Sequence, residues 1–151
     1  MADTHSDIIK ARAQNIANLT DDAVTKFTGD ILASAAGKME ERLGYQAYGN
    51  YVKMFTENLY TSSTEYHLLA DGQKKLRNLE TAESYYALYF LALALKEIDE
   101  GPVMSTSITF GEGQISPSPI GQLIDMKDQY KRAGDRITAR YGSGGLSVSV
   151  I

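Results

Sequence analysis

The sequence predicts a mainly α-helical bundle around one central buried helix, with a β-hairpin and a strand-like C-terminal tail. Apolar residues recur every three to four positions over 24–43 and again over 48–59, which is the spacing of amphipathic helices. The run from Tyr85 to Leu95 is apolar around the whole circumference of a helix, so other elements must cover it. After Gly101-Pro102, β-branched residues and serines replace the helical pattern.

The length of 151 residues fits a single domain. We divide it into an N-terminal helix within 1–19, a helical core over 20–142 that includes a hairpin at 103–116, and an extended arm over 143–151. The N-terminal helix is weakly amphipathic, and we expect it to be short or mobile.

The second predicted helix starts at Thr20, whose side-chain oxygen can cap it, with Asp21 and Asp22 at its positive end. It runs to Leu43 and stops at Gly44. Its apolar residues share one face: Val24, Phe27, Ile31, Ala35, Met39 and Leu43.

The middle of the chain holds three further predicted segments. A third helix runs from Tyr45 to about Tyr60, with an apolar face formed by Tyr48, Val52, Phe55 and Leu59. A short helix capped near Ser63 reaches Leu69. A fourth long helix, 81–100, is the centre of the predicted fold and ends at Gly101-Pro102.

A β-hairpin is predicted over 103–116, with Gly111-Glu112-Gly113 as its turn. A capping Ser118 and Pro119 then open the last helix, which runs to Tyr141. Its apolar stripe consists of Ile120, Leu123, Ile124, Tyr130, Ile137 and Tyr141.

The tail alternates branched apolar residues with serine, as a strand with one apolar face does. We expect this strand to pair with the hairpin or with a neighbouring molecule. The alternative is a disordered tail in which the alternation is accidental. The apolar residues assigned to this interface are Ile108 and Phe110 in the hairpin and Leu146, Val148 and Val150 in the tail.

The composition limits the function classes. A net charge of −4 argues against a protein whose main role is to grip phosphate backbones. The absence of cysteine excludes disulfides, thiolate zinc sites and cysteine nucleophiles. The longest apolar run has 11 residues, too few to span a bilayer, and the N-terminus lacks the apolar core of a signal peptide. We therefore expect no membrane contact and a cytoplasmic place of synthesis.

No pattern in the sequence predicts a catalytic, cofactor or metal site. His5 and His67 have no nucleophile motif or second ligand at helical spacing, so we interpret them as ordinary surface or core histidines. The acidic cluster at Glu97, Asp99 and Glu100 lacks the spacing of a calcium loop and is interpreted as a solvated face. The ten tyrosines have the helical spacing and acidic surroundings of core and interface packing rather than of base stacking.

The last helix carries a basic row at i, i+4 and i+8, formed by Arg132, Arg136 and Arg140. Lys127 and Lys131 add a second pair four residues apart. Two interpretations stay open: a solvated face near a helix C-terminus, and a contact with an acidic partner surface.

This order of segments resembles the head–tail adaptor (connector) proteins of tailed bacteriophages over roughly residues 20–142. The features that carry the resemblance are the helix end from Lys38 to Tyr45, the alanine- and leucine-rich helix 87–95, the Ser/Gly-rich hairpin, and the last helix with its spaced tyrosines and arginines. The region 45–80 is longer and richer in tyrosine than the family pattern.

The resemblance implies a non-enzymatic virion protein at the head–tail interface. Such adaptors form a homo-oligomeric ring, a dodecamer, that binds the portal protein on one side and a tail or tail-completion protein on the other. DNA passes through the channel without specific binding, and an acidic lumen would favour that passage. Another tail-completion or interaction module is an alternative, and so is a small helical ligand-binding protein or enzyme with a pocket beside the 85–95 helix.

Overall fold

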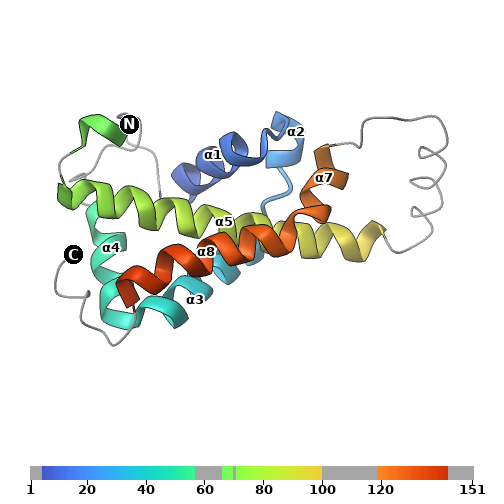
Figure 1. Ribbon diagram of the computed structural model, residues 1–151. Helices are drawn as coiled ribbons and strands as arrows, with labels where there is room; N and C mark the ends of the chain where they lie inside the picture. Colours follow the sequence, from blue (N-terminus) through green and yellow to red (C-terminus); the bar gives the residue numbers. More distant parts are fainter. Residues whose placement is uncertain (1–4, 57–65, 70, 100–118, 143–151) are drawn as a thin grey trace.

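The computed structural model describes residues 5–56, 66–69, 71–99 and 119–142, and these form a helical bundle (Figure 1). Every element in these ranges is a helix, which confirms the mainly α prediction. The predicted hairpin and tail, with Ile108, Phe110, Leu146, Val148 and Val150, lie outside the described residues. Within the described ranges, no helix is both long and apolar enough to cross a membrane.

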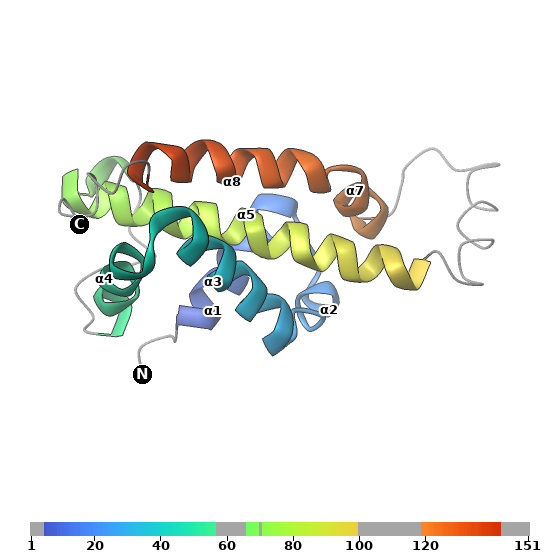
Figure 2. The same cartoon turned by 90° about the horizontal axis from the view of Figure 1, so that it is seen from below.

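The helices are arranged around the long helix α5, Asp71–Asp99. α8 runs along one side of α5, and α1 and α3 pack against it from the other, as Figure 2 shows. α4 lies against α3, and α7 packs on the C-terminal part of α5. The remaining bounds are α1 His5–Ala17, α2 Asp21–Val24, α3 Gly29–Leu43, α4 Tyr45–Thr56, η1 Tyr66–Leu68, α7 Pro119–Asp125 and α8 Lys127–Gly142.

The predicted central helix is confirmed, but it is longer than predicted because it begins at Asp71 rather than at Thr81. Leu76 and Leu79, which precede the predicted start, are buried and extend the apolar face of the helix toward its N-terminus. Arg77 and Glu80 are also buried there, and these charged residues hid the pattern in the sequence. The buried apolar residues of α5 are Leu76, Leu79, Ala82, Tyr86, Ala87, Leu88, Leu91, Ala92 and Leu95.

The prediction of one helix from Thr20 to Leu43 is wrong, because the helix is interrupted between α2 and α3. Thr20 caps α2 as predicted, accepting a hydrogen bond from the backbone N–H of Ala23 at 3.1 Å. Thr28 then acts as a second cap and accepts one from the N–H of Ile31 at 3.3 Å. The predicted apolar face is nevertheless largely confirmed, since Val24 is partly buried and Phe27, Ile31, Ala35, Met39 and Leu43 are buried.

The last helix is likewise two helices rather than one, with the change of direction at Met126 (Figure 1). This change lets Leu123 of α7 and Tyr130 of α8 both be buried in the core. The N-terminal helix, expected to be short or mobile, spans 13 residues as α1 and packs against α5, with Ile9 and Ala13 buried. In α4 the buried residues are Ala47 and Tyr51, one position away from the predicted face.

Candidate functional site

The packing of α8 on α5 decides which of its side chains face solvent. Tyr130, Gly134 and Thr138 are buried on the inner side of α8. A Cβ atom at Gly134 would lie 2.9 Å from the ring of Tyr86, so the two helices can approach this closely only because residue 134 is glycine. The opposite side of α8 therefore presents the arginine row to solvent.

A polar network between α8 and the helices α3 and α5 fixes this orientation. The Tyr86 hydroxyl donates a hydrogen bond of 2.6 Å to Asp135 Oδ1, and Lys131 Nζ donates one of 3.1 Å to Asp135 Oδ2. Arg42 reaches across from α3, donating from Nη2 to the Asp135 carbonyl at 3.0 Å and from Nε to Thr138 Oγ1 at 3.1 Å. These contacts join α3, α5 and α8 at one point.

The network also changes the acidity of its members. Burial alone would raise the pKa of Asp135, but the hydrogen bonds from Tyr86 and Lys131 outweigh it, so the pKa is lowered. The pKa of Tyr86 is raised, mainly by burial and then by its hydrogen bond to the Asp135 carboxylate. Both shifts favour an ionised Asp135 that accepts a hydrogen bond from a neutral tyrosine.

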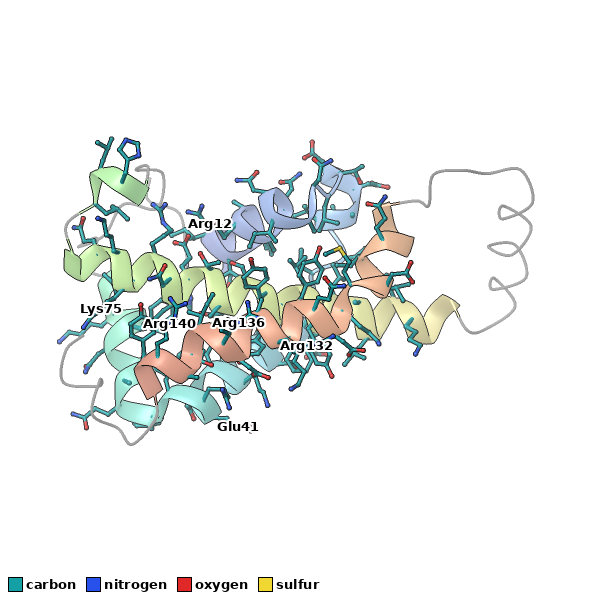
Figure 3. The ribbon with its side chains drawn as sticks, viewed as in Figure 1. Arg12, Glu41, Lys75, Arg132, Arg136 and Arg140 are labelled. Carbon is teal, nitrogen blue, oxygen red and sulfur yellow. The ribbon has the colours of Figure 1, made fainter. Side chains whose placement is uncertain are left out.

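The basic row consists of Arg132, Arg136 and Arg140, which are all exposed along α8 (Figure 3). The lysines of the same helix are paired: Lys127 with Asp128 at 3.4 Å and Lys131 with Asp135 at 3.1 Å. Arg132 donates only to the backbone carbonyl of Asp128, at 3.3 Å. Within the part of the chain that the structure describes, no arginine of the row forms an ion pair with a carboxylate.

A groove of about 800 Å³ lies beside the row, with Arg132 and Arg136 in its wall. Four elements meet there: the end of α1, the middle of α5, and α7 and α8. Its lining mixes apolar and polar side chains: Ile16, Ala17, Asn18, Tyr85, Gln122, Leu123, Met126, Gln129, Tyr130, Arg132, Ala133 and Arg136.

Two stacked tyrosines and a methionine shape the groove. The rings of Tyr85 and Tyr130 lie 5.9 Å apart at an interplanar angle of 25°, and Tyr130 is buried. Burial, followed by the proximity of Tyr85, raises the pKa of Tyr130. The Tyr130 hydroxyl contacts the sulfur of Met126 at 3.8 Å, while 37% of Met126 remains exposed to solvent. Methionine is flexible and polarizable, and for that reason it is frequent at adaptable binding surfaces.

A second polar centre, which no pattern in the sequence predicted, lies between α1, α4 and α5. His5 Nε2 lies 2.9 Å from Glu83 Oε1, and the Tyr48 hydroxyl donates to Glu83 Oε2 at 3.3 Å. Burial, and then the negative charge of Glu83, raises the pKa of Tyr48. The three side chains line a pocket of about 260 Å³. His5 therefore belongs to the folded bundle rather than to a loose N-terminus.

The same face of α5 carries a buried ion pair one turn earlier. Arg12 Nε donates to Glu80 Oε2 at 2.6 Å, and the Glu80 side chain has no exposed surface. Glu80 lies just before the predicted central helix 81–100 and Glu83 within it, and the sequence did not show that both belong to one buried face. Buried carboxylates need partners, and α1 supplies one to each.

The remaining candidates show no comparable arrangement. His67 is exposed in η1, away from the groove residues. Among the residues with described positions, no three His, Asp or Glu side chains are grouped as a metal site would require. No protein-family model, curated protein or solved structure matches the chain.

Proposed function

We propose that this chain is a structural virion protein, an adaptor ring that joins the portal of a tailed bacteriophage to its tail and leaves a channel for DNA. The observation that carries the proposal is the basic row on α8. Three arginines at i, i+4 and i+8 are exposed, and none has a carboxylate partner among the described residues. Arginine forks held in this way suit bidentate contacts with an acidic protein surface.

The way the row is held also supports an interface. Gly134, Asp135 and Thr138 bind the inner side of α8 to α3 and α5, so the outer side is presented by a rigid element. Rigid presentation reduces the entropy lost on association. The specific assignment to the adaptor family rests on the resemblance in sequence, in which a long apolar central helix precedes a basic last helix.

The groove supports a second candidate, a small helical ligand-binding protein. Tyr85 and Tyr130 offer an aromatic wall, and Arg132 and Arg136 offer positive charge, in a groove of a size that could hold a small anionic aromatic molecule. This candidate predicts a monomer whose melting temperature rises with such a ligand.

Light scattering coupled to size-exclusion chromatography, followed by electron microscopy of the eluted species, separates the two. The adaptor proposal predicts closed rings with a central channel, formed by the chain alone or upon addition of a portal ring. A chain that remains monomeric under both conditions, and is stabilised by a small anionic ligand, would contradict it.

A further inference from the structure

α3 presents an acidic outer face whose two glutamates form no ion pair with another helix within the described residues. Its inner residues, Ile31, Ala35, Met39 and Leu43, are buried, so the outer side is turned to solvent. Glu40 and Glu41 are exposed on that side, and the position of Glu41 can be followed in Figure 3. The only ion pair on that side within the described residues joins Glu41 to Lys38 at 3.4 Å along the same helix.

Between Leu32 and Lys38, the exposed residues of this outer face are small. Ala33, Ser34 and Gly37 are exposed, and a Cβ atom added at Gly37 would meet nothing within 4 Å. Small residues let another element approach a helix closely, so a partner could contact the glutamates without first displacing long side chains. We refer to residues 33, 34, 37, 40 and 41 as the α3 outer face.

We infer that the α3 outer face of one copy docks on the basic row and groove of α8 in a second copy. The two surfaces match in charge, since two exposed glutamates face three arginines that lack carboxylate partners within the described ranges. They also match in length, because the segments 33–41 and 132–140 each extend about 12 Å along a helix. The inference rests on the proposed assembly function and names the partner of the α8 surface.

The groove gives this contact an apolar component. Met126 is exposed at the groove while Leu123 and Tyr130 lie beneath it, so a docked helix with small side chains could cover the methionine. Exposed ion pairs alone add little affinity. Apolar surface of the groove that becomes buried on docking would add the rest.

A second copy fits these observations better than a nucleic acid does. Phosphates could accept the same arginine forks, but a chain with a net charge of −4 repels a polyanion overall. The acidic surface that the row requires is present on the chain itself. The arginine row is therefore better suited to bind an acidic protein surface than a nucleic acid.

A charge-swap experiment tests the pairing in the full chain. One variant carries Arg136→Glu and Arg140→Glu, which makes both surfaces acidic, and the other carries Glu40→Lys and Glu41→Lys, which makes both basic. Each variant alone should associate about 100-fold more weakly than the wild-type chain, because like charges then face each other. An equimolar mixture should recover association, since every contact between unlike variants is complementary again.

The matched control is Lys10→Glu with Lys26→Glu, which changes net charge by the same amount as the arginine variant but on other parts of the bundle. It should associate as the wild type does, and circular dichroism should show all variants folded. Dissociation constants from sedimentation velocity at two salt concentrations provide the readout, with weaker wild-type association at higher salt.

Failure of the inference and failure of the proposed function can be told apart. The inference is overturned if either variant associates as the wild type does, or if the equimolar mixture does not recover association. In both cases a wild-type chain that still assembles leaves the adaptor proposal in place. If the wild-type chain is monomeric alone and assembles only on a portal ring, the same variants are compared there, and rings that form equally well with both variants overturn the inference and leave the adaptor proposal in place. Duplex DNA binding that is lost only in the arginine variant, with self-association unchanged, would assign the row to nucleic acid and likewise overturn the inference.

Discussion

At the scale of single residues, Gly134 determines how closely α8 approaches α5. A Cβ atom there would lie 2.9 Å from the Tyr86 ring, which is itself fully buried. Gly134→Ala should therefore lower the free energy of unfolding by about 1–3 kcal/mol, through overpacking. Urea denaturation measures this change.

The matched control for this prediction is Gly37→Ala in α3, where the added methyl group meets nothing. Alanine favours a helix interior over glycine by about 0.5–1 kcal/mol, so this substitution should stabilise the protein. Destabilisation of similar size in both variants would show that the contact with Tyr86 does not govern position 134.

The carboxylate of Asp135 makes the stability of the protein depend on pH. Its pKa is lower in the folded protein than in the unfolded chain, so its contribution is fully present above the unfolded pKa of about 4 and is lost as pH falls through the folded value. Asp135→Asn should therefore destabilise the protein more at pH 7 than at about pH 2. An equal loss at both pH values, measured by urea denaturation, would mean that the carboxylate is not stabilised by Tyr86 and Lys131.

At the scale of helices, α5 carries the core. Leu91 has no exposed surface and lies on the helix against which α1, α3 and α8 pack. Leu91→Ala should lower the free energy of unfolding by about 2–5 kcal/mol. Leu68→Ala, at a site that is 66% exposed, should change it by less than about 0.5 kcal/mol. Similar losses at the two sites would place the core elsewhere.

The sequence predicted the existence of the long helices better than their ends. Apolar periodicity identified the inner face of α3, because burial of one face imposes that spacing, and the continuous apolar run 85–95 identified α5 as the buried central helix. The break at Thr28 was missed because threonine also occurs within helices, and the start of α5 was missed because Arg77 and Glu80 are charged yet buried. The ion pairs of Glu80, with Arg12 of α1 and with Arg77 one turn earlier on α5, explain how its charge is buried.

In the candidate site, too, the features within one helix could be predicted and the contacts between helices could not. The arginine row could be predicted as one exposed face from its spacing along a single helix. The groove beside the row could not, because it joins residues of α1, α5, α7 and α8 that are far apart in the sequence. The contact between His5 and Glu83, which are 78 positions apart in the sequence, could not be predicted either.

At the scale of the whole molecule, the bundle presents surfaces of opposite charge. The arginines of the basic row lie on α8 and Glu41 of the acidic outer face lies on α3 (Figure 3). The groove beside the row is formed by α1, α5, α7 and α8. A chain with a net charge of −4 that exposes three adjacent arginines without carboxylate partners in the described ranges is suited to bind an acidic protein surface. We therefore expect the α8 surface to be a protein interface.

Oxidative footprinting of Met126 measures directly whether the α8 surface is covered on assembly. Met126 is 37% exposed at the groove and its sulfur can be oxidised, whereas Met39 has no exposed surface and serves as the unreactive control. If α8 forms the interface, oxidation of Met126 slows markedly when the chain assembles, while labelling of Leu68, exposed in η1, is unchanged. Equal oxidation rates for Met126 in the assembled and dissociated protein would contradict an interface at α8.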